Sequence, residues 1–348
     1  MEIKNAIPFV RSSWRAAKKQ AILTDRSFLD LYTDILYCKF KYKTALSDYL
    51  LFNFMAFQDP AMREEYLFAP DWVRLVHNLN PPNDAPEFLA DKVDGYRRFA
   101  PYFFRDVLIL EDATDREIQA FADKHPTFYG KRAKSYAGRD VDRVTIDRTH
   151  MDALPEQLRA SKYDMLEEPI VQHPALDRVC PNAVASFRLT ILKHRGEIMI
   201  LPVSVRIALF DDVDIIKMGQ SSACVAIDEE GRFISPAVVN DSIFDPDFAT
   251  RYDVHPMTGH PIDDGRFVVP FYQEMLDMMV EITEQEQDHG HLGWDIAITD
   301  KGPCVIEANP WGHYDFYQYY DHVKRTMHGI RPTIEAFMGS SISELPNT

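Results

Sequence analysis

The sequence predicts an α+β fold, or a mixed α/β fold built on antiparallel sheets. Three observations support this prediction: helical periodicity in the first part of the 348-residue chain, hairpin patterns in its middle, and helices and hairpins in mixed order after that. A strict β–α–β alternation, the pattern of a parallel doubly wound sheet, is not seen. We therefore expect antiparallel sheets covered by helices.

The N-terminal part is helical in pattern. Residues 27–46 place apolar side chains at helical spacing, and we expect these on broadly one side: Phe28, Leu29, Leu31, Ile35, Leu36 and Phe40. Residues 59–68 continue this character. Residues 79–89, "LNPPNDAPEFL", are rich in proline and asparagine, so they are the best candidate for a linker.

Beyond the linker, helices and strands are mixed. The first elements expected there are helices at 90–103 and 115–126, a strand at 106–112, a strand–loop–strand unit at 127–147 and a strand beginning near 164. Two hairpins follow, at 185–210 and 223–235, and then two helices, at 269–285 and 320–338. The apolar face of the helix at 269–285 is expected to fill the core with Phe271, Met275, Met278, Met279 and Ile282.

Composition excludes several classes of function. The formal net charge is −16, which argues against nucleic acid or an anionic membrane surface as the main partner. The longest apolar stretch, near 48–57, is too short to cross a bilayer, so we expect no membrane insertion. The four cysteines are far apart and the start lacks an apolar leader, so we expect reduced thiols and a cytoplasmic location.

The stretch "GWDIAITDKGPCVIEANP", residues 293–310, carries the strongest chemical signal. It reads as a hairpin that turns near Lys301–Gly302. Glu307 and Asn309 share a face because they are two apart on a strand, and Asp295 should lie across from them. Two carboxylates and an amide oxygen would suit a nucleotide-bound magnesium ion. The alternative is a hairpin with polar residues on its wet face.

The same stretch resembles the closing metal motif of ATP-grasp ligases, and in particular the ATP-grasp group associated with sugar transfer. Four more stretches resemble that group in the same order: residues 91–100, 127–141, 167–192 and 254–276. The resemblance covers about 85–320 and implies ATP held between two antiparallel lobes. It divides the chain into a helical region (1–84), a first lobe (85–165), a second lobe with the metal site (166–330) and a tail (331–348).

The chain departs from the family pattern at the phosphate loop. Arg132 follows Lys131 where the family usually has proline, and the loop contains Gly138 as its one glycine. The resemblance implies that Lys92 and Lys131 approach the nucleotide phosphates, while Ser135 to Gly138 close over them. A surface lysine for Lys92 and a plain connecting turn for the loop are the alternatives.

The resemblance also implies a hinge strand that contacts adenine and ribose. It includes Glu167, Glu168 and Ile170. Adjacent strand residues point to opposite faces, so only one of the two glutamates can face the cleft. The residues alone do not decide which one, and a solvated charge pair before Pro169 is the alternative.

Arg188 and Arg206 are expected in facing strands of the hairpin at 185–210. A guanidinium among apolar strand residues is costly unless paired, and it suits a phosphoryl or carboxylate group. The alternative is a structural ion pair. His313, just after the metal motif, could touch substrate or be a structural histidine.

The resemblance implies an ATP-dependent carboxylate–amine ligase. ATP and one or two Mg²⁺ ions would be bound, Asp295, Glu307 and Asn309 would hold the metal, and Arg188, Arg206 and Lys131 would assist catalysis. The products would be an amide, ADP and phosphate, formed through an acyl phosphate. The substrates would be a small carboxylate and an amine, from a sugar, an amino acid or a peptide. A kinase and a nucleotide-binding module without turnover are the alternatives.

Overall fold

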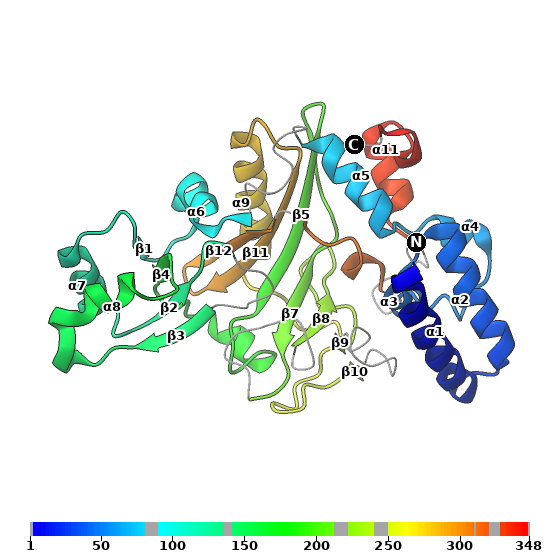
Figure 1. The fold of residues 1–348 in the computed structure, drawn as a ribbon, viewed down its shortest axis with the longest axis horizontal. Helices are drawn as coiled ribbons and strands as arrows, with labels where there is room; N and C mark the ends of the chain where they lie inside the picture. Colours follow the sequence, from blue (N-terminus) through cyan, green and yellow to red (C-terminus); the bar gives the residue numbers. More distant parts are fainter. Residues whose placement is uncertain are drawn as a thin grey trace.

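The computed structural model describes residues 3–80, 90–134, 141–211, 222–239, 250–309, 311–319 and 328–346. Figure 1 shows N-terminal helices at one end of the molecule, a large sheet in the middle and a small sheet with its own helices at the other end. Every strand pairing in both sheets is antiparallel within the described residues. The predicted α+β class with antiparallel sheets is confirmed.

Five helices form the N-terminal region: α1 (Ile3–Leu23), α2 (Phe28–Tyr42), α3 (Leu46–Leu51), α4 (Pro60–Glu64) and α5 (Ala69–Leu79). Helix α2 begins where the Ser27 hydroxyl accepts a hydrogen bond from the Asp30 backbone N–H at 3.2 Å. It ends at Lys43, which has a left-handed backbone with φ of 62°. Local capping therefore sets both ends of this helix.

The apolar face predicted for α2 is partly wrong. Leu31 and Ile35 are buried with Asp34 and Cys38, whereas Leu29 is 66% exposed and Phe40 is 64% exposed. At 100° per residue, Leu29 and Phe40 fall on the side opposite Leu31 and Ile35. The helix therefore has two apolar stripes, and only one of them packs into the core.

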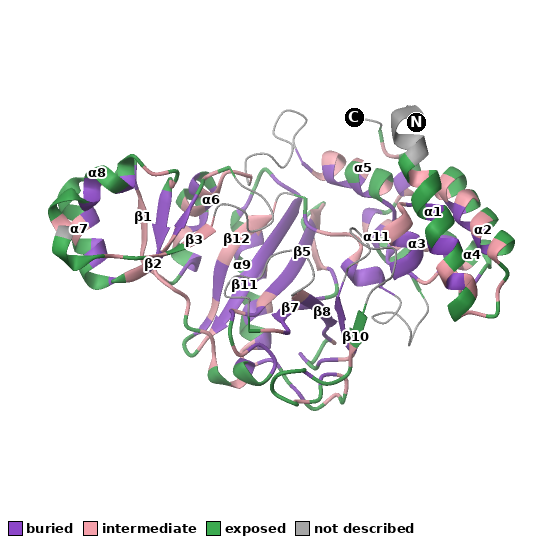
Figure 2. Cartoon of the chain, turned by 60° about the horizontal axis from the view of Figure 1, so that its bottom comes forward, coloured by how far each residue is buried: buried purple, intermediate pink, exposed green. Residues whose placement is uncertain are grey.

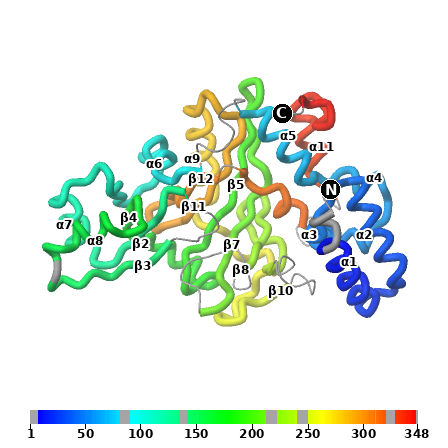
Figure 3. The backbone as a smooth tube through the Cα atoms, in the orientation of Figure 1, coloured from blue at the N-terminus to red at the C-terminus, as the bar shows by residue number. Residues whose placement is uncertain are grey.

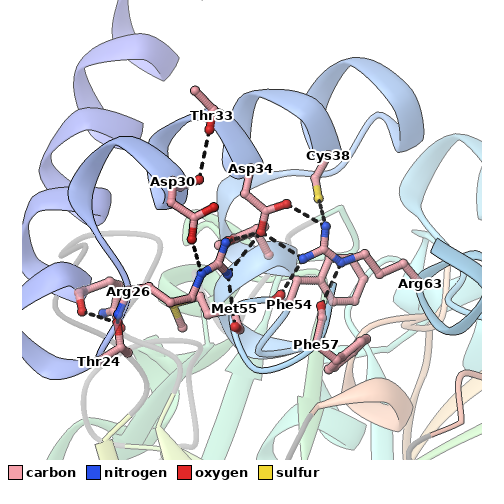
Figure 4. Close-up of polar contacts among 12 residues, drawn as sticks. Thr24, Arg26, Asp30, Thr33, Asp34, Cys38, Phe54, Met55, Phe57 and Arg63 are labelled. Atoms are coloured by element: carbon pink, nitrogen blue, oxygen red, sulfur yellow. Dashed lines mark hydrogen bonds and ion pairs between the residues drawn. The ribbon is translucent and has the colours of Figure 1, made fainter. Parts of the chain in front are cut away.

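A buried ion-pair network joins α2 to α4 (Figure 4). The Arg63 guanidinium is 1% exposed and pairs with both carboxylate oxygens of Asp34, at 2.7 and 2.8 Å. It also donates to the backbone carbonyls of Phe54 and Phe57. The Tyr49 hydroxyl donates to the Asp34 carboxylate at 2.7 Å. Both charges are thus paired and hydrogen-bonded, the condition for burying them.

The small sheet has the strand order β1-β4-β2-β3. Its strands are β1 (Val107–Ile109), β2 (Thr127–Lys131), β3 (Val141–Thr145) and β4 (Met165–Glu167). Helices α7 (Asp115–Lys124) and α8 (Leu154–Arg159) close a core that includes Ile118, Phe128, Leu158 and Leu166. The predicted helix at 115–126 and strand–loop–strand unit at 127–147 are confirmed.

The large sheet has the strand order β10-β9-β8-β7-β5-β11-β12, with β6 paired to β5. Its strands are β5 (Ser186–His194), β6 (Glu197–Ile200), β7 (Ser204–Ala208), β8 (Ser222–Ala226), β9 (Ala237–Val239), β10 (Thr250–Tyr252), β11 (His291–Thr299) and β12 (Gly302–Asn309). The second run of the hairpin at 185–210 is two strands rather than one. Pro202 lies between β6 and β7, and a proline cannot donate to the ladder.

Helix α9 (Tyr272–Gln285) packs on one face of the large sheet and fills its core with Met275, Met278, Met279 and Ile282, as predicted. Figure 2 shows the central strands β5 and β11 buried along most of their length. Helix α6 (Lys92–Phe99), in the expected first lobe, contributes Phe99 to this same core. None of the described helices has the length and apolar composition needed to cross a membrane.

Two expected segment boundaries differ from the structure. The small sheet continues to Glu167 in β4, two residues past the expected boundary after 165. The expected tail contains α11 (Arg331–Met338), which packs beside α5 through Ile334 and Met338 against Leu75 (Figure 3). Nearly all of the linker expected at 79–89 lies outside the described residues, as does the 320–327 part of the last predicted helix.

We expect Arg63→Met to destabilise the helical region by about 3 kcal/mol or more, because it leaves the buried Asp34 carboxylate with a reduced set of partners. The matched control is Lys41→Met, which removes an exposed ion pair of 2.7 Å with Glu64. That change should leave the unfolding midpoint close to that of the unchanged protein, because an exposed ion pair contributes little to stability. Denaturant unfolding followed by circular dichroism measures both. Equal unfolding midpoints for the two variants would contradict the larger stabilisation that we expect from the buried ion pair.

Candidate active site

A row of charged residues crosses the large sheet on the face opposite α9. Asp295 on β11 pairs in register with Glu307 on β12 and with Arg188 on β5, so the three side chains share one face. Arg206 on β7 lies on the same face, because it pairs with Ser186, two residues before Arg188. The register thus gathers residues from four strands that are far apart in sequence.

Arg188 and Asp295 form an ion pair with two close N–O contacts at the centre of this row. Arg188 Nε lies 2.7 Å from Asp295 Oδ1, and Nη2 lies 3.0 Å from Oδ2. The two residues are 2% and 6% exposed. Burial lowers the pKa of Arg188 and raises that of Asp295, and each partner's charge opposes the shift of the other. Nε and Nη1 of Arg188 and Oδ1 of Asp295 have no hydrogen-bond partner among the described residues, so the Nη2–Oδ2 contact is the hydrogen bond of the pair.

A β-bulge brings Glu307 to the polar face. The register shifts between Asp295 and Ile296, where Ile306 is the extra residue on β12. Val305 therefore pairs with Ile296 and is fully buried in the core, although it is only two residues from Glu307. Without the extra residue, regular alternation would put Val305 and Glu307 on the same face.

The three residues expected to hold metal lie together. The Asn309 amide donates to Asp295 Oδ2 at 3.1 Å, and Asp295 lies directly opposite Glu307 in the ladder. Lys92 at the start of α6 places its Nζ 3.5 Å from Glu307 Oε2. Each carboxylate of the trio thus has a cation as its partner: Arg188 beside Asp295, and Lys92 beside Glu307.

Glu167 and Glu168 point to different faces of the small sheet. Glu167 is 4% exposed and pairs with Lys131 Nζ at 2.8 Å. Burial alone would raise the pKa of Glu167, but Arg105 and Lys131 outweigh it and hold the pKa below its usual value. Glu168 instead accepts from the Asp106 backbone N–H at 3.0 Å, on the side of His125. Glu167 is therefore the glutamate that faces Lys131.

Arg105 is a site residue that the sequence did not reveal. Its guanidinium is 2.6 Å from Glu167 Oε2 and donates to the carbonyls of Val305 and Ile306 on β12. One side chain thus ties the small sheet to the bulge of the metal hairpin. Its partners lie 62 and about 200 residues away, so no local pattern in the sequence could have identified it.

A second polar group lies beside the arginines. Arg206 Nη2 is 3.3 Å from His313 Nε2, and His313 Nδ1 is 3.4 Å from Asp315. Burial, aided by the charge of Arg188, lowers the pKa of His313 to about 4. His313 is therefore a neutral imidazole, with Nε2 as the acceptor for Arg206 and Nδ1 protonated toward Asp315.

The segment that carries His313 is held by the N-terminal helices. The Gln318 side chain accepts from the Leu67 backbone N–H at 2.7 Å and donates to the Leu67 carbonyl at 3.0 Å. The Trp72 indole donates to the Trp311 carbonyl at 2.7 Å. The helical region thus holds the chain segment just after the metal hairpin.

A small cavity of about 10 Å³ lies where the two sheets meet. Lys92, Glu167 and Glu307 line it together with the apolar side chains of Phe103, Met165 and Ile306. A volume of this size holds about one water molecule. A nucleotide could enter only if side chains or lobes moved apart.

Three further residues predicted for the nucleotide site are Ile170, Ser135 and Gly138. Ile170 is half-buried in the segment that leads from β4 to the large sheet. Ser135 and Gly138 lie outside the described residues, as does Pro310. The phosphate loop therefore stays a prediction from the sequence.

We expect Asp295→Ala to destabilise the fold by about 3 kcal/mol or more, because it leaves the buried Arg188 charge uncompensated. Glu307→Ala should cost less than about 1 kcal/mol, since this carboxylate is 30% exposed and its cation, Lys92, can turn to solvent. Thermal unfolding of the two variants measures the difference. Similar losses for both would show that Arg188 does not depend on Asp295.

Comparison with known proteins agrees with the motifs. The family model described as sugar-transfer associated ATP-grasp matches residues 148–319. No curated protein matches the chain.

Three solved structures illustrate the structural matches. Carboxyaminoimidazole ribonucleotide synthase from Aspergillus clavatus, complexed with ATP, is 12% identical with a TM-score of 0.41, covering 70% of this chain and 54% of that chain. The D-alanine-D-alanine ligase from Coxiella burnetii is 11% identical with a TM-score of 0.40, covering 74% and 58%. D-alanyl-alanine synthetase A from Vibrio cholerae is 9% identical with a TM-score of 0.42, covering 74% and 66%.

The chain spans about half to two thirds of the length of these solved structures. The family match covers the hinge, both arginines and the whole metal hairpin. The expected resemblance is confirmed: over residues 148–319 the chain resembles the sugar-transfer-associated group of the ATP-grasp superfamily.

Proposed function

We propose that the protein is an ATP-dependent carboxylate–amine ligase that forms an amide through an acyl phosphate and releases ADP and phosphate. The observation that carries the proposal is the charge row Glu307–Asp295–Arg188, with Lys92 and Glu167 around the same cavity between the sheets. Oxygen donors, lysines and a buried guanidinium are the groups that phosphoryl transfer needs. The family match supports the same proposal.

Lys92 and Lys131 would bind the phosphate groups of the nucleotide. The Lys92 ammonium lies 3.5 Å from the Glu307 carboxylate, and the Lys131 ammonium lies 2.8 Å from the Glu167 carboxylate. Both of these acids line the cavity, and so does Lys92. On nucleotide binding, Lys92 would exchange Glu307 for phosphate oxygens, and Glu307 would become free to accept a metal ion.

Asp295, Glu307 and Asn309 would hold Mg²⁺. Their donor set fits, because two carboxylates and an amide oxygen on one face are hard oxygen ligands, and magnesium prefers few protein oxygens with phosphate and water as the others. The bound ion would neutralise charge on the phosphate oxygens. The charge of Arg188 opposes the rise that burial causes in the pKa of Asp295, and the ion pair orients the carboxylate.

Arg188 and Arg206 would stabilise the transferred phosphoryl group and the substrate carboxylate. The free Nη1 of Arg188 offers a donor on a side chain that is almost fully buried. A hydrogen bond from such a preorganised donor stabilises developing negative charge strongly. His313 orients Arg206 through its acceptor Nε2, so Arg206 keeps a fixed position beside Arg188.

The test is nucleotide turnover with a panel of amino acids and uronic acids as carboxylates, hydroxylamine as the amine, and MgATP. We expect ADP, phosphate and a hydroxamate, all lost when EDTA removes magnesium. Glu307→Gln should slow ADP formation by about 10- to 100-fold or more. Glu168→Gln is the matched control, since Glu168 points away from the cavity.

Three outcomes would overturn the proposal that the protein is a ligase. AMP with pyrophosphate would exclude an acyl phosphate. A stable phosphorylated product without any need for an amine would identify a kinase. Tight MgATP binding with no product across the whole panel would indicate a nucleotide-binding module.

Glu167 and Glu168 provide a separate test of the nucleotide site. Glu167→Gln should weaken binding of MgATP by about tenfold or more, ~1.4 kcal/mol, because Lys131 loses the charge that holds it at the cavity. Glu168→Gln should change the affinity by less than about twofold. Isothermal titration calorimetry with a non-hydrolysable ATP analogue measures both. A larger effect at Glu168 would place the nucleotide on the other face of the small sheet.

A further inference from the structure

The charge of the chain is distributed very unevenly. Residues 1–43 carry nine basic and four acidic side chains, whereas the remaining residues carry 29 basic and 50 acidic ones. Helix α1 contains five basic residues and no acidic one: Lys4, Arg11, Arg15, Lys18 and Lys19. The net charge of −16 therefore conceals a basic end. Such asymmetry indicates an anionic partner for that end alone.

The cations of α1 lie on its outer side. Arg11, Arg15 and Lys18 are exposed, and their spacing of four and three residues places them in one stripe of the helix. None of the described carboxylates forms an ion pair with them. By contrast, Arg26 is tied to Asp30 and Asp34, and Lys41 is tied to Glu64. The stripe Arg11–Arg15–Lys18 thus has no partner within the described part of the chain.

The same end carries exposed apolar side chains. Among the described residues, seven of the fourteen large exposed apolar side chains come from α1, α2 and their connection: Val10, Trp14, Ile22, Leu23, Leu29, Tyr37 and Phe40. Ile22, Leu23 and Leu29 are 79%, 64% and 66% exposed, and they flank the turn between the two helices. We call these three residues the apolar tip.

The position of the tip leaves it open to a partner. Figure 1 shows α1 and α2 at the end of the molecule farthest from α7 and α8, and Figure 2 shows their outer sides exposed. Ile22 continues the basic stripe, since it follows Lys18 by four residues. Asp25 is an exposed carboxylate in the turn, and the Asp30 carboxylate is paired with Arg26 at 2.6 Å.

We propose that the α1–α2 hairpin docks on an anionic lipid surface, with the apolar tip in the headgroup region and Arg11, Arg15 and Lys18 on the lipid phosphates. Amphipathic helices with cations and exposed Trp, Ile and Leu bind membrane interfaces in this way. Nucleic acid would leave the apolar tip without a contact. The acidic remainder of the chain is repelled by an anionic surface, so only the basic end can approach it.

The expectation that an anionic membrane surface is not the main partner rests on the net charge of −16. That expectation treats the charge as uniform over the surface. The structure instead separates a basic helical end from an acidic body. The inference adds surface docking without any membrane-crossing segment, and it does not depend on the proposed ligase activity.

The test is co-sedimentation of the full chain with vesicles of phosphatidylcholine and phosphatidylglycerol at 70:30, compared with pure phosphatidylcholine. We expect binding to the anionic vesicles only, and its loss in 0.5 M NaCl. Arg11→Gln with Arg15→Gln and Lys18→Gln should weaken binding by roughly 100-fold, because each cation near such a surface contributes about fivefold. Ile22→Ser with Leu23→Ser and Leu29→Ser should weaken it by at least about tenfold.

Matched control variants carry the same changes elsewhere on the surface. They are Arg116→Gln with Arg266→Gln and Lys301→Gln, and Val171→Ser with Val254→Ser and Val268→Ser, at residues that are all exposed. The controls should bind like the wild type. Equal losses in controls and test variants, equal binding to neutral vesicles, or no sedimentation would overturn the proposal. So would light scattering that shows a dimer abolished by the tip variant, since a second copy would then cover the tip.

Discussion

The buried ion pair between Arg188 and Asp295 is the interaction on which the candidate site depends. It joins β5 to β11 at the centre of the large sheet, and both residues are almost completely excluded from water. A pair of this kind persists only with good geometry and further partners. Two close N–O contacts join the pair, one of them a hydrogen bond, and Asn309 donates to the same carboxylate. Glu307 and Arg206 share the face. Arg206, Glu307 and Asn309 are therefore placed relative to this pair.

The other parts of the molecule pack around the strands that carry this charged row. The opposite face packs on α9, whose methionines and isoleucine fill the core beneath the strands. The N-terminal helices hold the segment after the metal hairpin through Gln318 and Trp72. The small sheet approaches from the other side with Lys131 and Glu167. Three separate layers thus converge on one charged row.

The sequence predicted the parts of the site that depend on local alternation. Glu307 and Asn309 share a face and Asp295 lies opposite, as the hairpin pattern indicates. The sequence could not predict that a bulge at Ile306 is needed to keep Val305 in the core, because a bulge leaves no local signature here. Arg105 was missed for a different reason: its partners come from two other parts of the chain.

The helical region shows the same limit. Periodicity identified helix α2, but the sequence pattern assigned two separate apolar stripes of this helix to one buried face. Only tertiary packing decides which apolar side of a helix is buried. The question of which glutamate faces the cleft, Glu167 or Glu168, could also be answered only from the tertiary structure. It depends on which face of β4 meets Lys131 and which meets His125. The sequence indicated which residue types belong to the candidate site, but it did not indicate which residues they contact.

Arg105 has one more consequence, for solubility. In the described strand order, β12 is the last strand of the large sheet, so its outer carbonyl groups have no neighbouring strand. An open strand edge invites pairing with another chain and aggregation. Arg105 occupies the carbonyls of Val305 and Ile306, and the bulge at Ile306 breaks the regular spacing that an added strand would need. Arg105, which pairs with Glu167, therefore also blocks part of the β12 edge against the addition of a strand from another molecule.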